Sequence, residues 1–131
     1  IGALADESST AVRGLVARRH AMIRIDQIWL AVEPIDMRAG TETVLARVVQ
    51  VFGAAHSHHA YVFANKRGNR LKVLVHDGLG VWLAARRLNQ GRFIWPRAGQ
   101  ANLSLDQEQW QALVVGLPWH RLGMFAVIDA L

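Results

Sequence analysis

Hydrophobic residues recur with different periods along the chain, and each period predicts a different element. The stretch 22–32 mixes β-branched and aromatic residues and stops just before Pro34, which predicts a first strand. Over 41–52 the apolar residues recur three and four positions apart, so a helix is expected there. Thr41 can cap the start of this helix, and Gly53 is placed to end it.

Short apolar runs separated by turn residues fill the middle of the chain. The turn signals are the sequences NKRGN, DGLG and NQG, which favour tight connections between strands. They predict an antiparallel meander of four strands, at about 60–65, 70–76, 80–87 and 92–95.

A second helix is expected after a polar loop. Ser104 and Gln107 have capping-box spacing, and apolar residues continue to about Val115, before Gly116 and Pro118. Two helices and one antiparallel sheet predict an α+β fold. We expect a single compact domain with a four- to five-stranded meander sheet and the two main helices packed on one face.

The length of 131 residues suits one ordinary domain with a sizeable core. We expect this domain to span 22–120. Residues 1–21 are weakly patterned and precede Met22, which could be an original start, so they are interpreted as an N-terminal extension that need not be native. The apolar stretch 121–131 has no clear period and is interpreted as a C-terminal tail.

The charge balance narrows the choice of partners. A net charge of +5 and a sequence pI of about 11.0 favour polyanions such as nucleic acid. The chain has no cysteine, which excludes disulfides and thiolate zinc sites and makes a reducing cytoplasm the simplest compartment. No apolar run approaches the roughly 18 residues that span a bilayer, so no membrane partner is expected.

The segment 65–97 concentrates this positive charge, with eight Lys and Arg against a single acid, Asp77. Such side chains suit phosphate contacts, and their sign bias exceeds what the protection of edge strands requires. Trp82, Phe93 and Trp95 could add stacking platforms, although aromatic residues in strands are usually core. The predicted nucleic-acid-binding residues are Lys66, Arg67, Arg70, Lys72, Arg86, Arg87, Arg92 and Arg97.

The side of the sheet on which Trp82 lies depends on one loop. An even-numbered turn within 77–80 places Trp82 on the apolar face of Val73 and Val75, where it would be core. A three-residue loop would move it to the face of Arg70 and create an aromatic and basic surface. Asp-Gly suits a primed two-residue turn, so the even loop and a core Trp82 are expected.

Two further motifs have a structural and a functional interpretation. Asp36 and Arg38 precede the first predicted helix, where a cap and an ion pair are favoured over a ligand site. His56, His58 and His59 could face a metal ion, but no cysteine or HExxH pattern supplies further ligands. A loop entering a strand is the favoured interpretation, and we expect neither a metal nor another cofactor.

Catalysis would need carboxylates that converge in space. A magnesium-dependent nuclease could draw on five acids, but the chain has no Walker loop, nucleophile elbow or Rossmann glycine pattern. We therefore expect no enzyme activity. The acids are Asp26, Asp36, Asp77, Asp106 and Glu108.

The order of several short motifs resembles a known family. The motifs are Asp36-Met37-Arg38 with Gly40, the run NKRGNRLK after Phe63, Asp77-Gly78, Arg87-Leu88, and Gly91-Arg92-Phe93 with Trp95-Pro96. Over about 22–119 the chain is similar to TnpB-type (second open reading frame) accessory proteins of the insertion sequence 66 transposon family. This resemblance implies a bacterial mobile-element protein that supports transposition beside a separate transposase.

Charge and resemblance together favour a non-enzymatic accessory factor for transposition, a form of DNA recombination. It would bind DNA, at transposon ends or target, through basic hairpins and assist the transposase of the same element. The alternative is a protein interaction module that docks on the transposase or a sister accessory protein without touching DNA. Exposed Trp95, Trp110 or Trp119 would favour that alternative.

Overall fold

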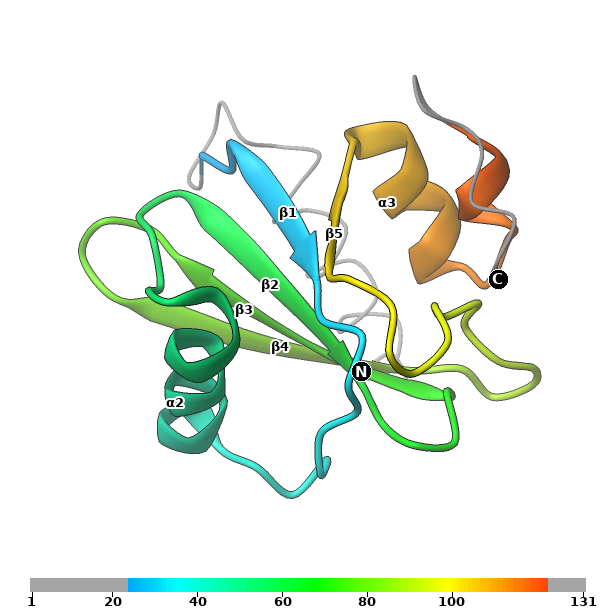
Figure 1. Cartoon of the computed structure of the whole chain (residues 1–131), viewed down its shortest axis with the longest axis horizontal. Coiled ribbons are helices and arrows are strands. Elements are labelled where there is room, and N and C mark those ends of the chain that lie inside the picture. Colours follow the sequence, from blue (N-terminus) through cyan, green and yellow to red (C-terminus); the bar gives the residue numbers. More distant parts are fainter. Residues whose placement is uncertain (1–23, 123–131) are drawn as a thin grey trace, which may run out of the picture.

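A five-stranded sheet forms the centre of the molecule, with strand order β4-β3-β2-β1-β5 (Figure 1). The computed structural model describes residues 24–122, so the expected N-terminal extension and nearly all of the C-terminal tail lie outside the described range. The strands are β1 (Gln27–Leu30), β2 (His59–Ala64), β3 (Arg70–His76), β4 (Val81–Arg87) and β5 (Leu103–Leu105). The helices are α2 (Thr41–Phe52), α3 (Gln107–Val114) and the short 3-10 helix η1 (Trp119–Arg121).

The expected α+β class is confirmed, and the sheet is mixed. β2, β3 and β4 are consecutive antiparallel neighbours, as the turn signals predict. β1 pairs with β2 in parallel because the connection between them is long enough to include α2. β5 then pairs antiparallel with the other side of β1.

The two main helices lie on opposite faces of the sheet, so the prediction that both pack on one face is wrong (Figure 1). Val62 of β2 points into a core that contains α3, whereas its neighbours Tyr61 and Phe63 point into a core that contains Val44 and Val48 of α2. Because β2 is the central strand, it is apolar on both sides and needs a helix on each.

The expected fourth strand of the meander, 92–95, is not a strand. Phe93 is nevertheless buried, and its backbone N–H donates to the carbonyl of Gly68 at 2.7 Å. The sheet gains β5 instead, in a stretch expected to be loop. Since Ser104 lies within β5, the capping box falls two residues later, between Asp106 and Gln109.

Helix α2 has the predicted bounds but not the predicted N-cap. Gly40 occupies that position without a side-chain hydrogen bond, because Thr41 is already the first helical residue. The predicted stop at Gly53 is confirmed. Its φ of 88° is the left-handed conformation that glycine adopts without strain.

The hairpin between β3 and β4 confirms the even-numbered loop but not its expected consequence. His76 pairs with Val81, so 77–80 form the connection and Trp82 stands opposite Val75, on the α3 face. Yet Trp82 is 45% exposed, and the prediction that it is core is wrong. The reason is that β4 is an edge strand and α3 contacts its other end, near Arg86.

Candidate nucleic-acid interface

Two turns meet at the end of the sheet where β3 begins. The first, 65–69, is held by the side chain of Asn65, whose Oδ1 accepts the backbone N–H groups of Asn69 and Arg70 at 3.0 Å each. Its Nδ2 donates to Asn69 Oδ1 at 2.8 Å. The turn is therefore shaped by its own asparagines, which leaves its cations free to project outward.

The chain after β4 docks on this turn through its backbone. Leu88 N–H donates to the Asn69 carbonyl at 2.9 Å, close to the bond between Phe93 and Gly68. Gly68 has a φ of 76°, and a Cβ built there would lie 3.9 Å from Arg92 Cβ, so the two segments are in contact. Cations distant in sequence thereby gather in one place, which we call the basic end: Lys66, Arg67, Arg70, Arg87 and Arg92.

Two arginines of the basic end face each other directly. Arg70 and Arg87 are partners in the register of β3 and β4, so their side chains leave the same face of the sheet. Like charges placed opposite each other across strands are destabilising. None of the five cations forms an ion pair within residues 24–122, where the pairs are Arg24–Asp26 and Arg38–Asp36. An anion bound between them would remove this repulsion.

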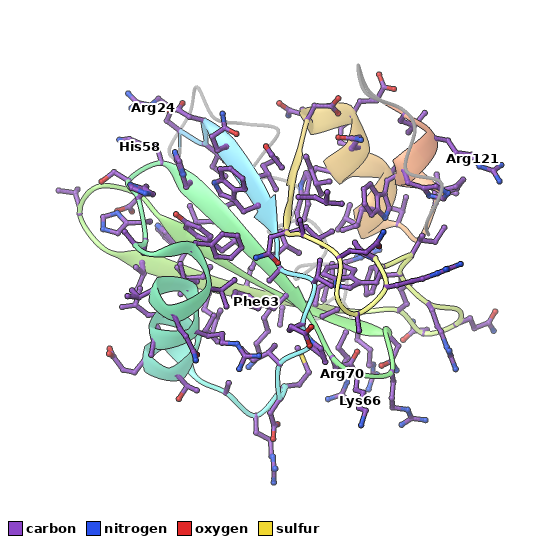
Figure 2. All side chains as sticks on the ribbon, in the orientation of Figure 1. Arg24, His58, Phe63, Lys66, Arg70 and Arg121 are labelled. Carbon is purple, nitrogen blue, oxygen red and sulfur yellow. The ribbon has the colours of Figure 1, made fainter. Side chains whose placement is uncertain are left out.

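All five cations can reach solvent. Figure 2 shows Lys66 and Arg70 at one end of the molecule, projecting from the ribbon, while Arg24 and Arg121 lie far from them. All five are exposed, Arg92 in the neighbouring turn included. The surface charge is thus concentrated at one end of the hairpin, although cations occur elsewhere.

Two adjoining hollows lie beside the basic end. The first has a volume of about 560 Å³, with 34–37 on one side and 65–70 on the other. The second, about 390 Å³, is lined by cations of β3 and β4, and Met37 and Arg70 line both. The structure therefore places the motif Asp36-Met37-Arg38 and the basic turn 65–69 beside the same hollow.

The segment before α2 forms the wall facing the basic turn, and it is firmly held. Ile35 is buried, and its N–H donates to the Ala64 carbonyl at 2.9 Å. At the other end Lys72 Nζ donates to the Ala39 carbonyl at 2.5 Å. Because both ends are anchored to the sheet, the residues between them keep a fixed position.

Asp36 and Arg38 form a forked ion pair on this wall. Arg38 Nη2 lies 2.8 Å from Asp36 Oδ2, Nε lies 3.2 Å from both carboxylate oxygens, and the backbone N–H of Arg38 donates to Oδ1 at 2.8 Å. Bonding to the Arg38 guanidinium lowers the pKa of Asp36 to about 2. The pair is exposed, at 92% for the arginine side chain and 58% for the aspartate, and it borders the first hollow.

Three predicted binding residues have different surroundings. Lys72 is half-buried and bonded to Ala39, as described above. Arg86 projects to the α3 face, where its Nε donates to the carbonyl of Val114 at 2.5 Å. Arg97 lies in the turn 97–100 and lines neither hollow. None of these three belongs to the basic end.

Several residues of the family-like motifs have structural roles. Gly78 and Gly91 have φ values of 91° and 82°, which turns require and side chains resist. Phe93 and Pro96 are buried, and Trp95 donates its indole N–H to the Ala31 carbonyl at 3.0 Å. These residues build the frame that carries the cations.

Asp77 organises the opposite tip of the β3–β4 hairpin. Its carboxylate accepts the backbone N–H of Leu79 at 2.8 Å, the indole N–H of Trp82 at 2.7 Å and the N–H of Gly80 at 2.8 Å. These donors favour the ionised form and lower the pKa of Asp77 to about 2.

This shifted pKa predicts an acid-dependent loss of stability. A carboxylate whose pKa is lower in the folded state stabilises the fold above its unfolded value, 3.8, and ceases to do so as pH falls toward about 2. We expect the urea midpoint to fall between pH 5 and pH 2.5, and to fall less in Asp77→Ala. The urea midpoint of Asp36→Ala is measured over the same pH range for comparison, since the pKa of Asp36 is also lowered to about 2. Equal falls in wild type and Asp77→Ala would show that Asp77 does not stabilise the fold.

The histidines of the HSHH motif pack against neighbouring residues, and the ring centroids of His56 and His59 are 5.3 Å apart. His59 Nδ1 accepts the Trp29 indole N–H at 3.1 Å, and burial lowers the pKa of His59. His58 has a φ of 64°, and its ring lies against Gly78. No group of three or more metal-ligating side chains gathers within the described part of the chain.

The five candidate acids also have individual partners or positions. Asp26 pairs with Arg24, and Asp106 caps α3 by accepting the N–H of Gln109 at 2.7 Å. Glu108 lies in the first turn of α3.

Within 24–122 no helix is long and apolar enough to cross a membrane.

Comparisons with known proteins match most of the chain. The family described as "IS66 Orf2 like protein" matches residues 26–124. A Sinorhizobium fredii protein named "Uncharacterized protein y4hO" is 33% identical over 94 residues, which are 71% of this chain and 82% of that protein. "Uncharacterized protein y4jC" from the same strain is 33% identical over 97 residues, 73% and 83% of the two chains. No solved structure matches.

Proposed function

The chain belongs to the family of IS66 Orf2 like proteins, and we propose that it is a non-enzymatic accessory factor that binds DNA and assists a separate transposase. Membership supports a role in transposition of an insertion sequence. The DNA contact is assigned to the basic end, with transposon ends or target as its ligand.

One observation carries the DNA contact. Arg70 and Arg87 stand opposite each other, flanked by Lys66, Arg67 and Arg92, and no acid from residues 24–122 forms an ion pair with them. The nearby carboxylate that borders the hollow, Asp36, is bonded to Arg38. A phosphate backbone supplies the missing negative charges at close spacing, and guanidinium groups pair with phosphate oxygens in two-bond geometry.

The salt dependence of binding to a DNA duplex tests this proposal. If three to five cations replace condensed counterions, the logarithm of the association constant falls against the logarithm of salt with a slope of about −3 to −5. Fluorescence anisotropy of a labelled duplex, measured over a series of salt concentrations, gives that slope. Absence of binding at low salt, or binding that salt does not weaken, contradicts phosphate contact.

Removing the carboxylate of Asp36 is expected to strengthen binding. Asp36→Asn removes one negative charge beside the basic end and releases Arg38 for a phosphate, so affinity at low salt rises about three- to tenfold. Asp26→Asn is the matched control, because it makes the same charge change and frees Arg24, which Figure 2 shows far from the basic end. Similar gains for both variants would mean that net charge alone controls affinity.

A second candidate function, docking on a partner protein, is favoured by the other tip of the hairpin. Leu79 is 98% exposed and Trp82 is 45% exposed, whereas Trp110 and Trp119 are fully buried. β3 has seven residues, so this tip lies about 20 Å from the basic end. Co-purification with the transposase after nuclease treatment separates the two functions: a complex that survives indicates a protein contact, and one that is lost indicates DNA.

A further inference from the structure

Resting on the proposed DNA contact, we infer that Arg38 is a base-reading residue that recognises guanine in the major groove, while the basic end holds the phosphates. The protein would then contribute sequence preference as well as affinity. Arg38 and the cations of the basic end are held in different ways, and this difference assigns them different parts of the DNA.

The five cations of the basic end differ from Arg38 in how their side chains are held. None of their charged groups makes a hydrogen bond or an ion pair with the described residues. Long side chains of this kind adapt to phosphates at many positions, which provides affinity and register but carries no sequence information. Lys66, Arg67, Arg70, Arg87 and Arg92 therefore suit the backbone of DNA.

Arg38 is held in a different way. Two of its nitrogens, Nε and Nη2, lie within 3.2 Å of the Asp36 carboxylate, which fixes the plane of the guanidinium. The carboxylate is itself fixed by the backbone N–H of Arg38, and the segment that carries both is anchored at Ile35 and Ala39. The guanidinium is thus held by the Asp36 carboxylate, and the backbone that carries it is held by the sheet. The group is already ordered before it meets DNA, so little conformational entropy is lost on binding.

The geometry leaves the outer edge of Arg38 available. Asp36 occupies the inner edge, and the side chain is 92% exposed. The Nη1 and Nη2 groups that point outward match the O6 and N7 acceptors of guanine, the commonest specific pairing of arginine in the major groove. The negative charge of Asp36 also discourages a phosphate from taking this position, so the two kinds of contact are kept apart.

The surface favours an intact duplex over unpaired bases. Neither hollow has an aromatic residue in its lining, Phe93 is buried, and Trp82 lies at the far tip of the hairpin. Single-stranded DNA would therefore find no stacking platform beside the cations. A side chain on this surface that contacts bases, such as Arg38, therefore has to approach their edges in a paired duplex.

The test compares a guanine duplex with one that lacks a single guanine atom, N7, and with one that has no guanine. Binding is measured by anisotropy to a 20-base-pair duplex of alternating G and C, to the same duplex with 7-deazaguanine, which lacks the N7 acceptor, and to an alternating A and T duplex. We expect about 5- to 50-fold tighter binding to the guanine duplex than to either of the others. Equal binding to the guanine and 7-deazaguanine duplexes overturns the inference.

Substitutions then assign the preference to one residue. Arg38→Met keeps much of the side-chain length but loses every donor, so it should abolish the guanine preference. Arg67→Met, the matched loss of charge at an unanchored cation, should weaken binding to all duplexes alike and keep the preference. Asp36→Asn should raise affinity yet reduce the preference, because Arg38 is no longer held.

The outcomes separate this inference from the proposed function. If no duplex binds at low salt, DNA binding itself fails. If all duplexes bind with the expected salt slope and without a guanine preference, or if Arg38→Met retains the preference, the basic end stands and the role of Arg38 fails.

Discussion

The variant Arg70→Glu is expected to fold more stably than the wild type and to bind DNA about 10- to 100-fold more weakly at low salt. Both effects come from its position opposite Arg87. The change converts a repulsive cross-strand pair into an attractive one, which is worth about 0.2 to 1 kcal/mol. At the same time it removes one phosphate contact and neutralises a second, so the salt slope becomes shallower by about 1 to 2.

The opposite signs make this variant informative. A loss of DNA affinity caused by unfolding would come with a lower urea midpoint, whereas the expected result combines weaker binding with a higher midpoint. Arg121→Glu is the matched control, since it makes the same charge change in η1, far from Arg70 in Figure 2. If both variants lose affinity equally, the basic end is not the DNA site.

Trp119→Ala is expected to give the largest loss of stability, about 3 to 5 kcal/mol. The side chain is fully buried in the core on the α3 face, and its indole N–H donates to the Ile94 carbonyl at 2.6 Å. Such a loss is a large fraction of the stability of an ordinary domain, about 5 to 15 kcal/mol.

The consequence should extend to the basic end. Ile94 directly follows the segment whose Phe93 bonds the 65–69 turn, so loosening it frees Arg92 as well. Urea unfolding measures the loss, and Trp119→Phe should cost less because it keeps most of the buried ring. Val115, at the C-terminal end of α3, is exposed, so Val115→Ala should change the free energy of unfolding by less than about 0.5 kcal/mol. A loss below about 1 kcal/mol for Trp119→Ala would show that this core contact is unimportant.

Local sequence signals identified most elements of the fold. Helix α2 and the strands β2, β3 and β4 could be predicted because their periods and turn residues are local properties. β5 could not, since its three residues form a strand only by pairing with β1. The opposite placement of the helices was also missed, because a stretch such as Ala60–Ala64 does not say which helix covers which side.

The candidate site shows the same division. The basic residues were evident from composition, but their grouping depends on backbone bonds from Leu88 and Phe93 to the 65–69 turn. Sequence reasoning separated Asp36 and Arg38 from that turn, and only the tertiary structure places them across one hollow. Met37, which lines both hollows, was noted only as part of a motif. The holding role of Asn65 was missed, although an asparagine four residues before another, around a glycine turn, is a usable signal.

The pairing of β1 with β5 has a consequence for how the chain folds. β2, β3 and β4 are joined by short turns and can associate early, while Ile28 must wait for Leu105 to complete the other side of β1. During synthesis, the edge of β1 therefore remains open until β5 has emerged from the ribosome. An unpaired strand edge invites association with another chain, so a product truncated before β5 should aggregate even though it contains the whole basic end.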